Sequence, residues 1–214
     1  KRGKNMKKIK LFDPVIRNEE RNAVRKVLDS HFWASGSGIN KVDNFEKKFK
    51  KYIKSEECVA VNSGTAALNL ALSLSNIKNK EVIVPSLTFV STVNAIKLNG
   101  GIPIFCDVNL ETGCISVDDI KKRITKKTVA VLPVHFAGLP CEIKSIQQIC
   151  KNHKLDLIED AAHAAGSTSE GMKIGSHGKL VCFSFHPAKN LAMPTGGLIS
   201  INNSNFKTSK QKLN

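Results

Sequence analysis

The sequence predicts an α/β fold of three layers, in which a mostly parallel seven-stranded sheet is covered by helices on both faces. Strand and helix patterns alternate from about residue 40 onward, which is typical of such sheets. The apolar runs are continuous rather than alternating, as expected of strands buried on both faces. A chain of 214 residues, 41% of them hydrophobic, can bury one substantial core. We therefore expect one main domain.

Seven short apolar runs supply the predicted strands. In chain order they are residues 58–62, 81–84, 102–106, 128–134, 155–159, 180–185 and 197–201. Each has the length and composition of a buried strand. Ligands of an open parallel sheet bind beyond the carboxyl ends of its strands, so the residues that follow these runs are candidates for a site.

Helical patterns lie between the runs. Ser116 and Asp119 form a capping box ahead of Ile120, which predicts the start of a helix. Another helix is predicted before the first strand, where four apolar residues recur at helical spacing: Val42, Phe45, Phe49 and Ile53.

The charge and the cysteines narrow the classes of function. The net charge of +15 raises the question of nucleic acid as a partner. The lysines are spread over every predicted helix, and no aromatic residues alternate with arginine to form a stacking platform, so nucleic acid is disfavoured. The six cysteines lack the spacing of metal ligands. They predict buried free thiols in a reducing compartment and no metal site.

The two ends of the chain are polar. We expect residues 1–10 to be a basic, disordered arm and residues 204–214 to be a polar tail, with the main domain at 11–203. No charged-then-apolar leader opens the chain. No apolar stretch reaches the roughly 18 to 20 residues that a membrane span needs. A soluble, cytoplasmic protein is expected.

Lys189 follows the sixth apolar run and lies five residues after Ser184. An amine that loses water at the mouth of a sheet can shed its proton, attack a carbonyl and form a Schiff base. A solvated lysine stays protonated and unreactive. The alternative is that Lys189 is one of the many lysines that solvate the surface.

The stretch after the first strand predicts a phosphate site at the start of a helix. Gly64 allows the backbone to approach a ligand closely, and the N–H groups of Thr65 and Ala66 are expected to face outward. Unpaired amides and the helix dipole together attract a phosphate. The alternative is an ordinary helix that begins with serine and glycine.

Residues that follow two other predicted strands contribute an acid, an imidazole and an aromatic ring to the same edge of the sheet. Asp160 and His163 follow the fifth run, so the carboxylate and the imidazole are expected at one rim, although Asp160 could instead cap the next helix. Phe89 follows the second run and could cover a flat ligand. Its alternative role is core packing at the start of a helix.

A phosphate site, a buried acid and a nucleophilic lysine are what pyridoxal phosphate requires, as anchor, partner of the pyridine nitrogen and Schiff-base amine. The acid keeps the ring nitrogen protonated, so the ring can accept the electrons of the carbanion formed from an amino donor. The released lysine is then the natural general base. The sequence therefore predicts a pyridoxal-phosphate enzyme.

Five stretches carry a resemblance to a known family. They are Asn62 to Leu68 (NSGTAAL), Pro85 to Thr92 (PSLTFVST), Leu132 to Gly138 (LPVHFAG), Ile158 to Gly166 (IEDAAHAAG) and Phe183 to Asn190 (FSFHPAKN). In order and in spacing they resemble the signatures of the DegT family of sugar aminotransferases. The resemblance covers about residues 10 to 203.

The resemblance implies a fold type I pyridoxal-phosphate domain and a homodimer. It implies conversion of a keto group on a nucleotide-linked deoxysugar to an amine, with glutamate or glutamine as donor, for polysaccharide or glycoconjugate synthesis. Lys189 matches the Schiff-base lysine, Asp160 the pyridinium partner, and His163 a position near the ring and its phenolic oxygen. The remaining matches are Gly64, Thr65 and Ser184 for the phosphate, Phe89 for stacking, and residues 33–45 for the border of the sugar-nucleotide site.

Members of the family continue beyond the strand that follows the lysine, into a C-terminal small domain, and from the resemblance we expect this domain to be absent here. Three hypotheses stay open. The first is an aminotransferase, and the second is a dehydratase on the same scaffold, against which the presence of Lys189 counts because such relatives lack the lysine. The third is an inactive remnant or a non-enzymatic basic binding protein.

Overall fold

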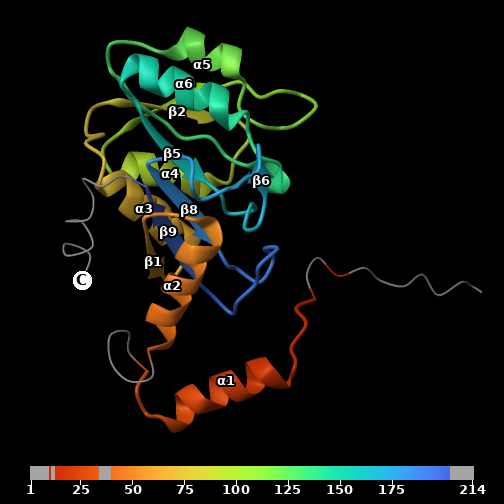
Figure 1. The fold of residues 1–214 in the computed structure, drawn as a ribbon. Helices are drawn as coiled ribbons and strands as arrows, with labels where there is room; N and C mark the ends of the chain where they lie inside the picture. The colour runs from red at the N-terminus through yellow and green to blue at the C-terminus, as the bar shows by residue number, and fades with distance from the viewer. Residues whose placement is uncertain (1–9, 11–12, 34–39, 203–214) are drawn as a thin grey trace, which may run out of the picture.

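The computed structural model describes residues 10, 13–33 and 40–202, and its central element is a seven-stranded sheet (Figure 1). Its strands are β1 (Glu57–Val61), β2 (Glu81–Pro85), β3 (Ile102–Cys106), β4 (Thr128–Val131), β5 (Asp156–Asp160), β8 (Leu180–Ser184) and β9 (Gly197–Ile201). Each of the seven apolar runs therefore forms one strand. The fourth strand is shorter than its run, and the fifth extends to Asp160.

The sheet is mostly parallel, as predicted. Its strand order is β1-β9-β8-β5-β4-β2-β3. Pairing is parallel from β3 through to β8, whereas β9 is antiparallel to both of its neighbours, β8 and β1. The carboxyl ends of all strands except β9 therefore meet at one edge of the sheet, together with the first residues of β9.

Helices cover both faces of the sheet and give the three predicted layers (Figure 1). The helices α3 (Gly64–Ser73) and α4 (Val90–Leu98) pack on one face, and α2 (Lys41–Ile53), α5 (Val117–Arg123) and α6 (Ile143–His153) pack on the other. Successive residues of β8 show the division, because Cys182 joins the core beneath α3 and α4 whereas Phe183 joins the core beneath α2.

Both helical predictions are confirmed, with one correction. In α2 the side chains of Phe49 and Ile53 are buried. At the start of α5 the Ser116 hydroxyl accepts the Asp119 amide at 3.3 Å. The Asp119 carboxylate, however, accepts the amide of Asp107 at 2.9 Å instead of returning to Ser116. Only one of the two hydrogen bonds of the predicted capping box is thus formed, because the Asp119 carboxylate binds the backbone of the loop before α5 instead.

Several elements lie outside these layers. The helix α1 (Asn18–Asp29) stands apart from the sheet in Figure 1, and none of its side chains is buried by the described chain. Two short strands, β6 (Thr168–Ser169) and β7 (Met172–Lys173), and a 3-10 turn, η1 (Phe136–Gly138), are elements that the sequence does not predict. They are too short to leave a periodic pattern.

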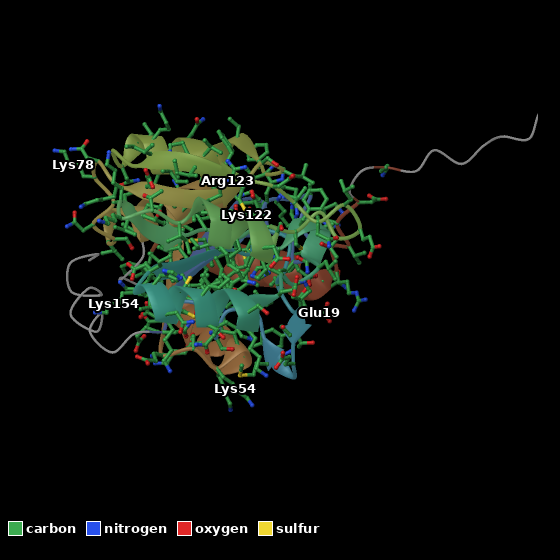
Figure 2. All side chains as sticks on the ribbon, turned by 90° about the horizontal axis from the view of Figure 1, so that it is seen from above. Glu19, Lys54, Lys78, Lys122, Arg123 and Lys154 are labelled. Carbon is green, nitrogen blue, oxygen red and sulfur yellow. The ribbon has the colours of Figure 1, made fainter. Side chains whose placement is uncertain are left out.

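Among the described residues, the basic side chains that Figure 2 labels lie at separate places, with Lys54, Lys78 and Lys154 apart from the neighbouring pair Lys122 and Arg123. All six cysteines, which fall within the described residues, are buried and unpaired, as predicted. Within the same residues no helix is long and apolar enough to cross a membrane. Residues 1–9 of the predicted arm and the predicted tail at 204–214 lie outside the described residues.

Candidate active site

A cavity of about 370 Å³ lies at the carboxyl ends of β1, β2, β5 and β8. Most of the predicted site residues line it: Gly64, Thr65, Phe89, Asp160, His163, Ser184 and Lys189. The sheet topology thus brings together groups that are far apart in the sequence. This is the edge at which an open parallel sheet binds its ligands.

The start of α3 forms one end of the cavity. Ser63 is the N-cap residue, and its hydroxyl accepts the Ala66 amide at 3.1 Å while its carbonyl accepts the Ala67 amide at 3.0 Å. The expectation that the Ala66 amide faces a ligand is therefore wrong, because the N-cap has taken it. Gly64 and Thr65 precede the first helical hydrogen bond, so their two amides and the helix dipole are what this end offers to an anion.

Gly64 and Ser184 are in close contact across the cavity floor. A Cβ atom at position 64 would lie 2.7 Å from the Cβ of Ser184 and 3.1 Å from its hydroxyl oxygen. Glycine is therefore required at position 64 for the serine at the end of β8 to reach the helix start. The contact places the Ser184 hydroxyl beside the two amides, where the three groups can bind one phosphate.

Asp160 is the acid of the cavity. Its side chain is buried, with the residue 4% exposed. One carboxylate oxygen, Oδ2, accepts the Thr92 hydroxyl at 2.8 Å, and the other, Oδ1, accepts the Ala162 amide at 3.1 Å. In the described chain β5 is followed by the short strand β6 and not by a helix, so Asp160 caps no helix, and it lines the cavity.

Lys189 lies in a tight turn after β8. Its amide donates to the His186 carbonyl at 2.8 Å, and the Ala188 amide donates to Nδ1 of the same histidine at 3.2 Å. Partial burial lowers the pKa of Lys189, and the nearby Asp160 charge opposes that shift. Since a lower pKa leaves more of the amine neutral, Lys189 differs from a surface lysine in the direction that a nucleophile needs.

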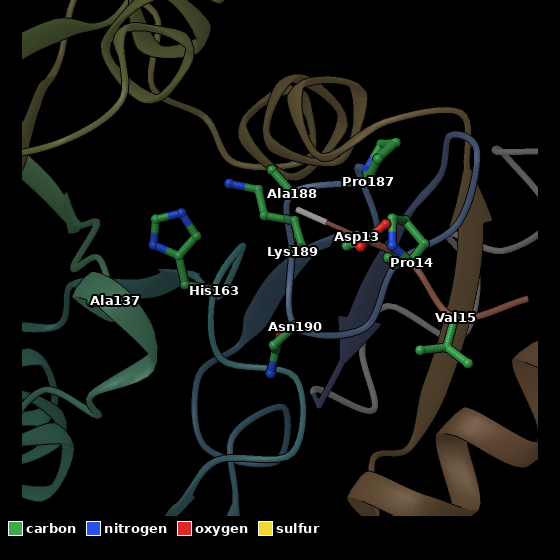
Figure 3. A pocket seen from close by; sticks show the side chains of 10 residues that line it. Asp13, Pro14, Val15, Ala137, His163, Pro187, Ala188, Lys189 and Asn190 are labelled. Carbon is green, nitrogen blue, oxygen red and sulfur yellow. The ribbon is translucent and has the colours of Figure 1, made fainter. Parts of the chain in front are cut away.

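His163 borders this cavity and a second one of about 680 Å³, which Asp13 and Asn190 also line. In Figure 3 the amine of Lys189 extends toward the His163 imidazole, whereas the Asn190 side chain points away from that amine. Burial lowers the pKa of His163, the positive charge of Lys189 lowers it further, and Asp160 acts in the opposite direction. The imidazole is thus biased toward its neutral form, which can both donate and accept a hydrogen bond.

Phe89 lines the cavity and is 72% exposed. The alternative that it packs in the core is therefore wrong. Its position follows from the local fold, because it is the N-cap residue of α4, where the chain leaves β2 and turns back over the sheet. An aromatic face this accessible is available to stack on a flat ligand.

Other residues of the site are missed by sequence reasoning. The most important is Thr92, which is fully buried against Asp160. It lies one helical turn after Phe89, so a search at i, i+3 spacing from the predicted stacking residue could have found it. Further lining residues without a prediction are Thr88, Ser91, Phe136, His186 and Thr195.

The groups present fit pyridoxal phosphate. The start of α3 and the Ser184 hydroxyl offer donors for a phosphate, Asp160 offers an acid for the pyridine nitrogen, and Lys189 offers an amine for the aldehyde. Pockets for small ligands enclose about 300–1,000 Å³, and the cavity falls within that range. Among the described residues no cluster of histidine, cysteine or acidic side chains could hold a metal ion.

Comparison with known proteins gives one consistent family. The family model described as the DegT/DnrJ/EryC1/StrS aminotransferase family matches residues 14–214. GDP-perosamine synthase of Vibrio cholerae is 38% identical over 195 residues, covering 91% of this chain and 53% of that protein. Spore coat polysaccharide biosynthesis protein SpsC of Bacillus subtilis is 41% identical over 188 residues, covering 87% of this chain and 48% of that protein.

A solved structure supports the same grouping. Helicobacter pylori PseC, an aminotransferase involved in the biosynthesis of pseudoaminic acid, matches with a TM-score of 0.88 and 28% identity, covering 96% of this chain and 55% of that chain. The predicted fold class and the family resemblance are confirmed. The chain spans about half the length of the curated relatives it matches.

Proposed function

Because the chain belongs to the DegT/DnrJ/EryC1/StrS aminotransferase family, whose members depend on pyridoxal phosphate, we propose that its cavity binds this cofactor and serves amino transfer to a nucleotide-linked deoxysugar. The acceptor is a keto group of the sugar, and the amino donor is glutamate or glutamine. The product serves polysaccharide or glycoconjugate synthesis. The single observation that carries the proposal is the convergence of Lys189, Asp160 and the start of α3 on one cavity.

Each residue has a defined task in this proposal. The amides of Gly64 and Thr65, with the Ser184 hydroxyl, bind the phosphate. Asp160 accepts a hydrogen bond from the pyridine nitrogen, and Phe89 covers one face of the ring. Ala66 is left out, because its amide is bound to Ser63.

The proton steps fall to Lys189 and His163. When bound, the cofactor accepts the electron pair left behind as the amino donor loses its α proton. The amine of Lys189 takes up that proton and later returns one, and its lowered pKa favours the neutral form that a general base needs. Burial and the Lys189 charge lower the pKa of His163 and so favour its neutral form, in which it can donate a hydrogen bond at the cavity rim.

The substrate class and the setting rest on the named relatives. The Vibrio cholerae relative is a GDP-perosamine synthase, and the Bacillus subtilis relative serves spore coat polysaccharide. These names support a nucleotide-linked sugar as acceptor and a role in surface polysaccharide synthesis. We also propose that the protein acts as a homodimer in the cytoplasm.

The first experiment is a titration of the chain with pyridoxal phosphate. We expect a visible absorbance band that borohydride abolishes, with the label recovered on Lys189 by peptide mass spectrometry. The Lys189→Ala variant should show no such band. A wild-type chain without the band, or a variant that keeps it, would contradict the proposed cofactor chemistry.

The second experiment separates aminotransferase from the two other hypotheses. The loaded protein is incubated with a nucleotide-linked keto-deoxysugar, with and without glutamate or glutamine. An amino sugar that forms only with the donor supports amino transfer, whereas a deoxygenated sugar formed without it indicates a dehydratase. Steeply salt-dependent binding to DNA or RNA without cofactor uptake would favour the basic binding protein.

A further inference from the structure

Thr92 is a buried hydroxyl that the proposed chemistry leaves without a task. It lies on α4 and is 0% exposed. Its hydroxyl is 2.8 Å from Oδ2 of Asp160, across 68 positions in the sequence. On its other side the hydroxyl is 2.9 Å from that of Thr88, a residue of the cavity wall. Two threonines four residues apart, one before α4 and one within it, thus connect the wall of the cavity to its acid.

The direction of this hydroxyl chain is fixed by chemistry. An ionised carboxylate only accepts hydrogen bonds, so the single proton of the Thr92 hydroxyl is donated to Asp160. Thr92 can then act toward Thr88 only as an acceptor, and Thr88 is the donor. Every proton in the chain therefore points toward the carboxylate, so the two hydroxyls form one directed path of hydrogen bonds that ends at Asp160.

The remaining acceptor capacity of Asp160 faces the cavity. A carboxylate offers about four lone-pair positions. Thr92 occupies one on Oδ2 and the Ala162 amide occupies one on Oδ1. These two bonds come from different elements, so together they fix the plane of the carboxylate while leaving it open toward the cavity that it lines.

We propose that Thr92 is a positioning residue, which holds the Asp160 carboxylate turned toward the ring nitrogen of the cofactor. Thr88 supports it by fixing the direction of its hydroxyl. This inference rests on the proposed function, because it concerns the bond between Asp160 and a bound pyridine ring. It goes beyond that function by assigning two residues that act on the ring through Asp160.

The test compares two ligands that differ at the ring nitrogen. Dissociation constants are measured for pyridoxal phosphate and for its 1-deaza analogue, in which a C–H group replaces that nitrogen. The wild-type chain should prefer the natural cofactor, and Asp160→Asn should lose most of this preference. In Thr92→Val, which keeps the shape and loses the hydroxyl, the preference should fall by about tenfold, the scale of one lost hydrogen bond to a charged group.

Two further variants keep the test decisive. Thr92→Ser retains the hydroxyl and should restore the preference, while Thr88→Val should reduce it less than Thr92→Val does. A purely structural role for Thr92 predicts that Thr92→Val weakens both ligands equally, and that result would overturn the inference. A wild-type chain that binds neither ligand would remove the proposed function itself, and the inference with it.

Discussion

Two neighbouring carboxylates at the end of β5, Glu159 and Asp160, are both buried, with exposures of 0% and 4%. They lie on opposite faces of the sheet, because successive side chains of a strand alternate. Asp160 faces α4 through Thr92 and borders the cavity. Glu159 faces the other layer and lines neither cavity described above.

The surroundings of Glu159 form a closed network. One of its carboxylate oxygens lies 2.8 Å from Nε2 of His135, and the other accepts the Gly178 amide in a short hydrogen bond. Nδ1 of His135 accepts the Cys141 amide at 3.1 Å. Since Nδ1 accepts a hydrogen bond, the ring proton is on Nε2, and the Nε2–H group donates a hydrogen bond to Glu159. The described chain itself supplies partners to both nitrogens of the ring and to both oxygens of the acid.

The difference shows how one strand can serve stability and chemistry at once. Glu159 binds His135, at the start of η1, and Gly178, in the loop before β8, so it ties both segments to β5. Asp160 likewise accepts two donors, from Thr92 and Ala162, but it also lines the cavity, where a ligand can supply a third. Each carboxylate accepts one hydrogen bond on each oxygen, so the difference lies in where it stands: Glu159 is enclosed by the fold, whereas Asp160 lines a cavity that a ligand can enter.

The largest expected effect is the loss of stability when the hydrogen-bond network around Glu159 is broken. Glu159→Ala leaves the His135 and Gly178 donors buried without a partner, so the free energy of unfolding should fall by about 3–5 kcal/mol. Urea denaturation followed by circular dichroism measures the change. Glu159→Gln is the matched control, because its amide oxygen can still accept one of the two donors, and its loss should be smaller. A loss below about 1 kcal/mol in Glu159→Ala would contradict the structural role.

Asp160→Asn should affect cofactor affinity much more than stability, in contrast to Glu159→Ala. The amide group of the introduced asparagine can donate a hydrogen bond to the Thr92 hydroxyl. That hydroxyl can then rotate and donate to Thr88 instead. No buried group loses its partner, so the free energy of unfolding should change by no more than about 1 kcal/mol. Cofactor affinity should fall by about tenfold or more, because the charged partner of the ring nitrogen is lost. Titration with pyridoxal phosphate measures that loss. A variant that unfolds as readily as Glu159→Ala would erase the distinction between the two carboxylates.

The same pair shows how far sequence reasoning reaches. Asp160 and Glu159 stand side by side in the IEDAAHAAG stretch, and the strand period predicts that only one can face the cavity. Gly64, Asp160 and Lys189 meet at one cavity as the strand pattern predicts, since a parallel sheet collects its carboxyl ends at one edge. Local patterns and topology are therefore sufficient for the fold and for the main chemical groups.

Partners that depend on long-range packing were not predictable. Nothing in the sequence pairs His135 with Glu159 or Thr92 with Asp160, because each pair joins different elements through a single side-chain bond. The prediction for the Ala66 amide fails for a related reason, since the serine hydroxyl before a helix can accept either of two amides. The exposure of Phe89 depends on how α4 leaves the sheet, and periodicity carries no information on that angle.

Two glycines extend the comparison to backbone positions. A Cβ atom at Gly178 would meet the Glu159 carboxylate, and one at Gly64 would meet Ser184 at 2.7 Å. Each alanine variant should lose about 1–3 kcal/mol of unfolding free energy through overpacking. Gly64→Ala should also weaken the binding of pyridoxal phosphate. Gly178→Ala, which lies beside Glu159 and outside the cavity lining, should leave the affinity of the folded protein for this cofactor unchanged. Equal weakening in both variants would refute a phosphate site at the start of α3.

Phe89→Ala is expected to lower the affinity for the cofactor and to leave the stability of the fold nearly unchanged. Because Phe89 is 72% exposed, the free energy of unfolding should change by less than about 0.5 kcal/mol. Loss of ring stacking should cost about 0.5–1.5 kcal/mol of cofactor binding, a several-fold rise in the dissociation constant. Phe105→Ala is the matched control, since Phe105 is 50% exposed on β3 and lies outside the cavity lining. A similar loss of affinity in both variants would argue against stacking by Phe89.

The smallest expected effect concerns the pH at which Lys189 loses its proton in the cofactor-free chain. Burial lowers the pKa of Lys189 and the Asp160 charge raises it, so Asp160→Asn removes the raising influence and should move the pKa lower still. The measurement is the pH dependence of Lys189 acetylation by acetic anhydride, followed by peptide mass spectrometry, because only the neutral amine reacts. Glu159→Gln removes a carboxylate from the opposite face of β5 and should leave the midpoint in place. If the midpoint instead rises in Asp160→Asn, or falls equally in both variants, the two carboxylates do not act on separate faces of the sheet.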